Sequence, residues 1–241
     1  MSNSQLLPFT KMQAQGNDFI VLNGLENELP ECSNEFVRTI TERRYGIGCD
    51  QLLVLTPSID ADAHMRIFNN DGTEAANCGN GLRCAGSLLL DSLNKASVSI
   101  ALNDRIVKAT RTEHGIAVEM GTAQITNQTD THVDIEIGNQ HSVFFEAVES
   151  FPENRNVEIV TGQVADHAYI DIIERGAGRT PACGSGACAT AAAIWQVEGH
   201  DRPQTIEMPG GTVLVSGTLD GVILTGSIAT VFTGQYSIST P

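Results

Sequence analysis

The chain has 241 residues, which suits one large domain or two small ones, and its 41% apolar and 18% charged residues are ordinary for a globular protein. Its 29 acidic and 14 basic residues give a formal charge of −15. A field of that sign repels nucleic-acid backbones and anionic lipid, so we expect no nucleic acid and no membrane among its partners. The sequence shows no signal-peptide pattern and no apolar run near the roughly 20 residues that span a bilayer, so we expect a cytoplasmic protein. Its six cysteines are then expected as thiols.

Short strands dominate the predicted secondary structure, and one surface helix precedes most of them. The segment 33–44 begins with Ser33, a residue type that caps helix N-termini. Phe36, Val37 and Ile40 fall on one side of it, which predicts an amphipathic helix. Alternating apolar and polar residues predict half-buried strands elsewhere. These strands cover 64–69, 97–102, 105–110, 115–120, 132–137, 141–148, 168–174, 212–217, 221–226 and 228–234.

Two further helices are predicted at 81–93 and 186–197, and both are apolar nearly all round. A helix of that kind is buried on most of its circumference. Each is introduced by Cys-Gly-x-Gly and flanked by predicted strands. The sequence therefore predicts an α+β fold of two similar halves, each with mixed strands wrapped around a buried central helix and with the active site in the cleft between them.

The boundary between the halves is expected near residues 111–116, where RTEHG interrupts the apolar pattern. We therefore assign 1–114 to the first half and 115–227 to the second. The last strand, near 228–241, is expected to complete the first half.

Cys78 and Cys183 each stand directly before Gly-x-Gly at the start of a predicted buried helix. The first N–H groups of a helix lack partners within the helix and carry the positive end of its dipole. A thiol beside them is expected to ionise more easily than the pKa of ~8.5 of a free cysteine. The glycines let a small ligand approach the backbone, so a carboxylate can sit on the helix start within reach of the sulfur.

Two such sites facing each other across a cleft place Cys78 and Cys183 on opposite sides of one carbon. One cysteine as thiolate can remove a proton while the other as thiol delivers a proton to the opposite face, which inverts a stereocentre. Converging N–H groups would stabilise the developing charge on the carboxylate, by about 3–4 kcal/mol for a well-placed donor. Such chemistry requires no cofactor.

Two other uses of the cysteines remain open. Structural zinc usually takes C-x2-C pairs, whereas the spacings here are C-x5-C (78, 84) and C-x4-C (183, 188), so we expect no metal. Cys84 and Cys188 fall inside apolar helices and are expected to be core thiols, and Cys32 and Cys49 have no comparable setting. Two thiols facing across a cleft could also form a disulfide, which would be a hazard to activity.

Several motifs, in order along nearly the whole chain, resemble those of the diaminopimelate epimerase family. They are KMQAQGNDFIVLN (11–23), RRYGIGCDQLLVL (43–55), FNNDGTEAANCGNGLRC (68–84), IGNQH (137–141), NRNVEIV (154–160), ERGAGRTPACGSGACA (174–189) and MPGG (208–211). The resemblance implies a cofactor-independent isomerase that interconverts LL- and meso-diaminopimelate for lysine and peptidoglycan precursor biosynthesis. It also implies a homodimer.

By that resemblance, Cys78 and Cys183 are the catalytic acid/base pair. The reacting carboxylate would lie on the backbone N–H groups of Gly79, Asn80, Gly184 and Ser185. The distal amino acid group would be read by Asn69, Asn139, Asn156 and Arg175, with Glu174 in the same pocket. Asn17 and Gln51 match positions near the site, and His141 matches a supporting position near the thiols.

These residue types suit that substrate independently of the resemblance, although each has a plainer role open to it. An arginine can grip a carboxylate with two parallel hydrogen bonds, and asparagines can serve an ammonium and a carboxylate together. However, Asn17, Asn139 and Asn69 could be turn or loop-capping residues. Arg175 and Glu174 could form a surface ion pair, and His141 could make a structural hydrogen bond.

The chain departs from the family pattern at Gln13, Ala14, Gln140 and Arg179. Arg179 places a cation four residues before Cys183, where it could favour the thiolate or alter closure of the loop. Two rival functions therefore stay open. One is a two-cysteine racemase of another amino acid, and the other is a non-catalytic thiol or metal-binding protein.

Overall fold

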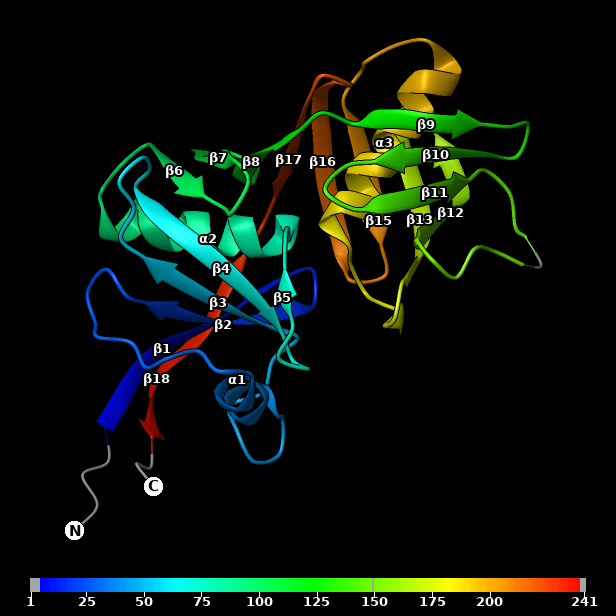
Figure 1. The fold of residues 1–241 in the computed structure, drawn as a ribbon. Coiled ribbons are helices and arrows are strands. Elements are labelled where there is room, and N and C mark those ends of the chain that lie inside the picture. Colours follow the sequence, from blue (N-terminus) through cyan, green and yellow to red (C-terminus); the bar gives the residue numbers. More distant parts are fainter. Residues whose placement is uncertain (1–4, 149, 239–241) are drawn as a thin grey trace.

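Two buried helices form the centres of the two halves, α2 (Gly79–Ser92) and α3 (Gly184–Glu198). They belong to a computed structural model that describes residues 5–148 and 150–238. Each helix starts two residues earlier than predicted, because the glycines after each cysteine are already helical. Figure 1 shows each helix wrapped by its own group of strands. The predicted α+β fold of two similar halves is therefore confirmed.

The first half surrounds α2 and begins and ends with neighbouring strands, since β1 pairs antiparallel with β18. Both ends of the described chain consequently lie on the same side of the molecule (Figure 1). The elements around α2 are β1 (Gln5–Ala14), β2 (Asn17–Asn23), α1 (Asn34–Thr41), β3 (Gln51–Thr56), β4 (Ala63–Asn69), β5 (Glu74–Ala75), β6 (Ser97–Ala101), β7 (Ile106–Thr112), β8 (Gly115–Gly121) and β18 (Ala229–Ile238).

The second half surrounds α3, which contacts β10, β11, β12, β15, β16 and β17. Its elements are β9 (Gln124–Gln128), β10 (His132–Glu136), β11 (Gln140–Phe144), β12 (Asn156–Val164), β13 (His167–Glu174), β14 (Gly178–Arg179), β15 (Gln204–Met208), β16 (Gly211–Thr218) and β17 (Gly221–Gly226).

The two halves repeat one pattern of strand pairing. From β1 the chain of partners runs antiparallel to β2, parallel to β3, antiparallel to β4, parallel to β6, and antiparallel to β7 and then β8. From β10 the same series of directions runs through β11, β12, β13, β15, β16 and β17. In each half the long helix lies between the fourth and fifth strands of this series in chain order. The duplicated cysteine motif therefore reflects duplication of the whole supersecondary unit.

The halves are joined by an antiparallel pairing of β8 with β17. Strands β7 and β8 form a hairpin in which Thr112 pairs with Gly115, so the expected boundary near 111–116 falls at this turn. Both strands of the hairpin contact α2. The chain then passes from β8 to β9 through residues 122–123.

Helix α1 covers the face of the first sheet that points away from α2. Ser33 is its N-cap, with its hydroxyl accepting from the Phe36 N–H at 3.2 Å, as predicted. Val37 and Ile40 are fully buried in a small core with residues from β1, β2 and β3. No helix among residues 5–148 and 150–238 is long and apolar enough to cross a membrane.

Candidate active site

Both predicted catalytic cysteines are the N-cap residues of the buried helices. Cys78 has φ −155° and ψ 104°, and Cys183 has φ −130° and ψ 114°. The Cys78 Sγ accepts from the Gly81 N–H at 3.3 Å, and the Cys183 Sγ accepts from the Gly186 N–H at 3.4 Å. Each sulfur therefore takes the place that a serine or aspartate oxygen usually occupies at a helix start.

The first turns of α2 and α3 meet at the boundary of the two halves. A Cβ added to Gly184 would lie 2.9 Å from the Asn80 Oδ1 and 3.2 Å from the Asn80 backbone nitrogen. A Cβ on Gly79 or on Gly184 would also lie 3.0 Å from the same Leu224 methyl group. Only glycine lets the two helix starts approach this closely. The positive ends of both helix dipoles thus converge on one region.

Both thiols are harder to ionise than a free cysteine, contrary to the expectation from the helix dipole. Burial raises the pKa of Cys78 to about 11, although the N–H groups of Gly81 and Asn80 oppose it. The pKa of Cys183 is raised well above its usual range by burial, then by the carboxylates of Glu174 and Glu158. Loss of solvent therefore outweighs the helix N-terminus at both cysteines.

Carboxylates surround the Cys183 side of the site. Glu174 accepts from the Thr180 hydroxyl at 2.6 Å, and its charge raises the pKa of both catalytic thiols. Burial in turn raises the pKa of Glu174. A carboxyl with a raised pKa whose charge acts on both thiols is a candidate to hold a proton taken from a sulfur.

His141 and Glu158 form a fully buried pair beneath the start of α3. The His141 Nδ1 lies 2.9 Å from the Glu158 Oε1, and both side chains have no exposed area. A Cβ on Gly186 would collide with this same Oε1, so the carboxylate lies directly under the first turn of α3. His141 is thus close to the site, and its contact within the described chain is Glu158 rather than a sulfur.

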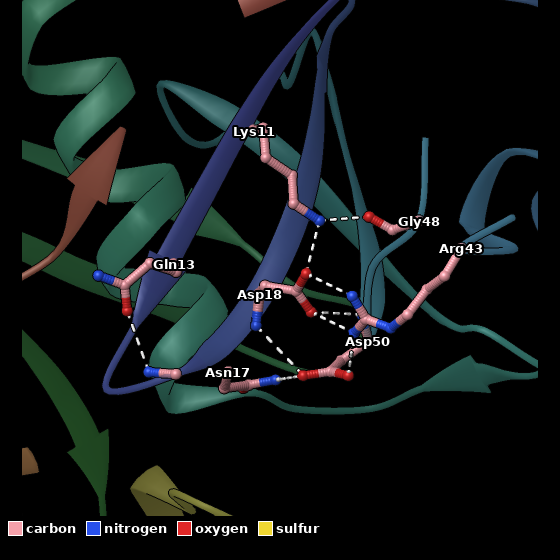
Figure 2. Close-up of polar contacts among 8 residues, drawn as sticks. Lys11, Gln13, Asn17, Asp18, Arg43, Gly48 and Asp50 are labelled. Carbon is pink, nitrogen blue, oxygen red and sulfur yellow. Dashed lines mark hydrogen bonds and ion pairs between the residues drawn. The ribbon is translucent and has the colours of Figure 1, made fainter. Parts of the chain in front are cut away.

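Three predicted side chains of the first half form hydrogen bonds near the start of α2. The Asn17 Oδ1 accepts from the Asn80 Nδ2 at 3.3 Å, and the Asn17 Nδ2 donates to the Asp50 carboxylate at 3.0 Å. Figure 2 shows the amide of Asn17 pointing to Asp50. Gln51 donates to Asn69 at 2.9 Å across the β3–β4 pairing.

Three of the four residues predicted to read the distal group lie in the second half, and the fourth, Asn69, ends β4 in the first half. The Asn156 Oδ1 accepts from the backbone N–H of Arg175 at 2.9 Å, and Asn156 lies beside His141 in the β11–β12 pairing. The Arg175 side chain is exposed and donates to the Asn154 carbonyl at 3.4 Å. Asn139 is exposed in the β10–β11 turn. Arg175 and Asn139 are thus less tightly held than Asn156.

Arg179 forms an ion pair at the surface of the second half. Its guanidinium pairs with the Asp171 carboxylate at 2.9 Å, and its side chain is 68% exposed. The expectation that Arg179 favours the thiolate of Cys183 or alters closure of the loop stays a prediction.

Four residues close to the site were not predicted from the sequence. Arg83 is a fully buried charge in α2, Glu158 is a fully buried charge in β12, Asp50 anchors Asn17 and Thr180 binds Glu174. The sequence could have indicated two of these residues, Arg83 and Glu158, because each is a charged residue type within an otherwise apolar buried segment.

Three of the remaining cysteines are buried in the two cores. Cys84 and Cys188 are fully buried free thiols in the core, as predicted, and Cys49 is buried in the smaller core beneath α1. Across the described ranges, no group of three or more His, Cys, Asp or Glu side chains is arranged to hold a metal ion.

Comparisons with known proteins agree with the motifs and the duplicated fold. The family model of diaminopimelate epimerase matches residues 9–126 and 127–231. The chain is 34% identical to a diaminopimelate epimerase of Halorhodospira halophila, covering 95% of both chains. It is 36% identical to that of Phenylobacterium zucineum, covering 98% of this chain and 99% of the relative.

Solved structures of more distant proteins share the fold. A Bacillus anthracis phenazine biosynthesis protein of the PhzF family superposes with a TM-score of 0.77 at 18% identity, covering 97% of this chain and all of the other. A hydroxyproline epimerase from Agrobacterium vitis gives 0.69 at 14% identity, covering 100% and 95%. From the family model and the relatives of more than 30% identity, the chain belongs to the diaminopimelate epimerase family.

Proposed function

We propose that the protein is an isomerase that interconverts LL- and meso-2,6-diaminopimelate with two cysteines and no cofactor, in the synthesis of lysine and of peptidoglycan precursors. The observation that carries this proposal is the approach of two Cys-capped helix starts to each other, with Asn80 against Gly184. Family membership supports the choice of substrate.

In the proposed reaction, the substrate carboxylate lies on the N–H groups of Gly79, Asn80, Gly184 and Ser185. One thiolate takes the α-proton, and the electron pair that remains on the carbon is delocalised into that carboxylate. The opposite thiol then delivers its proton to the other face of the carbon, so the two cysteines exchange protonation states. The converging helix dipoles stabilise the charge that develops between these steps.

Before the reaction, one thiol must lose its proton, which burial makes costly for both. Glu174 is the proposed acceptor, because its charge acts on both sulfurs and its own pKa is raised by burial. Cys78 is the proposed resting thiolate, since the carboxylate of Glu174 acts on it, whereas the carboxylates of Glu174 and Glu158 both act on Cys183.

The distal end of the substrate is proposed to bind Asn69, Asn139, Asn156 and Arg175. A substrate without a second amino acid group would leave these side chains unpaired, so it should react poorly. Turnover of lysine, histidine and proline, measured beside diaminopimelate, tests this preference. Faster turnover of any of the three would favour a racemase of another amino acid.

The test of the reaction is exchange of the α-proton with solvent deuterium. Wild-type protein should wash deuterium into both LL- and meso-diaminopimelate. The variants Cys78→Ala and Cys183→Ala should lose inversion, whereas the core variant Cys84→Ala should retain it. Absence of exchange in wild type, or full inversion in both single variants, would refute the proposal.

We further propose a cytoplasmic homodimer. Exposed apolar side chains on β1 and β18 support an association surface, namely Leu6, Val231 and Phe232, with exposed fractions of 54%, 55% and 47%. Phe232 packs edge-on against Phe9 at a ring distance of 5.8 Å. Light scattering should give twice the mass of one chain for wild type and a reduced mass for Phe232→Asp.

A further inference from the structure

A buried positive charge sits in α2 five residues after Cys78. Arg83 has no exposed area, and its acceptors within the described chain are all amide or carbonyl oxygens. A buried guanidinium without a carboxylate is costly, and such a charge usually has a defined electrostatic partner nearby. The hydrogen bonds of Arg83 lead through two amides to a carboxylate nearer the surface.

The shortest of these hydrogen bonds begins a series of hydrogen bonds that runs from the core toward the surface. The Arg83 Nη2 donates to the Asn80 Oδ1 at 2.6 Å, and the Asn80 Nδ2 donates to the Asn17 Oδ1 at 3.3 Å. The Asn17 Nδ2 donates in turn to the Asp50 Oδ2 at 3.0 Å. A cation thus begins the chain and an anion ends it, with two amides between them.

The charges at the two ends fix the orientation of both amides. Arg83 can only donate, so Asn80 must present its oxygen to Arg83 and its nitrogen to Asn17. Asp50 as a carboxylate can only accept, so Asn17 must present its nitrogen to Asp50 and its oxygen to Asn80. Hydrogen bonds in a chain of this kind polarise one another in the same direction.

Asp50 is itself held in place by a network at the surface. Figure 2 shows the carboxylates of Asp18 and Asp50 on either side of the Arg43 guanidinium. Arg43 donates to Asp50 at 2.8 Å and to both oxygens of Asp18, and Asp18 also pairs with Lys11 at 2.6 Å. The Asp50 Oδ2 also accepts from the Asp18 backbone N–H, so this oxygen is aimed at β2.

The amide at the centre of the chain touches both catalytic helices. Asn80 lies in the first turn of α2, and its Oδ1 is the atom that a Cβ on Gly184 would approach at 2.9 Å. A change in the orientation of this amide would therefore alter the contact between the two helix starts. The first N–H groups of both helices are the proposed carboxylate site.

We propose that Asp50 is a positioning residue for the reaction, because it orients the Asn17 and Asn80 amides in a chain of hydrogen bonds that Arg83 completes from the core. This inference rests on the proposed function for the identity of the reaction. The orientation itself depends on the described contacts alone. Asp50 is 41% exposed in its side chain, so it can be replaced without disrupting the core.

A double-mutant cycle tests whether Asp50 acts through Asn17. Asp50→Ala should lower kcat/KM for diaminopimelate by about tenfold to a hundredfold, the usual effect of losing a hydrogen bond to a charged group. In an Asn17→Ala background the same change should cost less than about threefold, because its effect passes through Asn17. Equal losses in both backgrounds would overturn the inference.

Arg43→Gln is the matched control. It removes both surface ion pairs of Arg43 but keeps the Asn17–Asp50 hydrogen bond, so kcat/KM should stay within about threefold of wild type. Thermal unfolding of Asp50→Ala and Arg43→Gln should show similar losses of stability. An equal loss of kcat/KM in the two variants would assign the effect to the surface ion pairs and contradict the proposal.

A second readout requires no substrate. In protein labelled with 15N-asparagine, the side-chain amide signal of Asn80 should shift in Asp50→Ala and stay in place in Arg43→Gln. An unchanged Asn80 signal in Asp50→Ala would overturn the inference, whatever the enzymatic activity. A shifted signal in a protein whose wild type does not epimerise diaminopimelate would refute the proposed function and leave the positioning chain standing.

Discussion

The starts of α2 and α3 have nearly the same backbone but different charged surroundings. Each cysteine caps its helix with an extended backbone and accepts from the N–H three residues later. Glu158 and Glu174 both raise the pKa of Cys183, whereas Glu174 raises and the buried cation of Arg83 lowers the pKa of Cys78. The local motif thus determines the geometry, and residues from other strands determine the proton affinity.

This difference shows how one duplicated motif can supply two unlike groups. A two-base reaction in a resting enzyme needs one sulfur without its proton and one with it. Symmetrical surroundings would give both thiols the same proton affinity, and only substrate binding could then distinguish them. The carboxylates act unequally on the two thiols, since both Glu158 and Glu174 act on Cys183 and Glu174 acts on Cys78. This difference supports the proposal that Cys78 is the resting thiolate.

The largest expected effect comes from removing one sulfur at a time. Cys78→Ala and Cys183→Ala should each lower the rate of inversion by about a hundredfold to ten-thousandfold, the range for loss of a general acid or base. Each variant should still exchange the α-proton of only one of the two isomers, because one face keeps its sulfur. Deuterium wash-in, followed by mass spectrometry for each isomer separately, measures this. Exchange of both isomers by either variant would break the assignment of one sulfur to each face.

The second effect compares the same substitution at matching positions of the two motifs. Gly186→Ala should lower the free energy of unfolding by about 1–3 kcal/mol, since its Cβ would collide with the buried Glu158 carboxylate. Gly81→Ala should be close to neutral. Its Cβ would lie 3.1 Å from a Leu53 methyl group, and this small cost is offset by the better helix propensity of alanine. Urea unfolding measures the free energy of unfolding of both variants. Equal losses in Gly186→Ala and Gly81→Ala would contradict the expected difference between the two helix starts.

The third effect is a dependence of stability on pH that comes from Cys78. Burial raises its pKa above that of a free cysteine to about 11 in the folded protein, so the folded state holds the proton more tightly than the unfolded state. This contribution is present below pH 9 and is lost as the pH rises through 11. Stability should fall by about 2 kcal/mol more in wild type than in Cys78→Ser over that interval. Parallel curves for the two proteins, from urea unfolding at each pH, would contradict the raised pKa.

The smallest effect tests the carboxylate beneath Cys183. Glu158→Gln keeps an oxygen for His141 but removes a negative charge, so the pKa of Cys183 should fall. Alkylation of Cys183 by iodoacetamide at pH 9 should become several-fold faster, while alkylation of Cys78 should not change. Glu207→Gln is a matched control, because Glu207 pairs with His167 in the same way on the surface. An equal increase in the alkylation rates of Cys183 and Cys78 in Glu158→Gln would contradict the assignment of the Glu158 charge to Cys183.

The sequence predicted both buried helices and their cysteine caps, because each motif lies within one short segment. It did not predict β2 and β3, whose central residues are all buried. The core around α2 covers one face of these strands and the core beneath α1 covers the other, so no alternation of apolar and polar residues remains. The alternation rule therefore cannot identify these two strands, because both of their faces are covered.

The same limit applies to the site. The cap position of Cys183 could be inferred from neighbouring residues, whereas its proton affinity depends on Glu158 and Glu174 from two other strands. Burial, which reverses the expected direction of both pKa shifts, appears only once the halves are packed. The division of the chain at residues 114 and 115 and the roles of the remaining site residues stay predictions.

The pairing of β1 with β18 has a consequence for how the chain folds during synthesis. Strand β1 can pair with β2 as soon as both are made, but it gains its other neighbour, β18, only when residues 229–238 have been made. All strands of the second half are translated before that point, so the later repeat can close before the earlier one. The half that carries Cys78 can therefore be completed only after the half that carries Cys183 has been translated, and loss of β18 would leave β1 without one of its two neighbours.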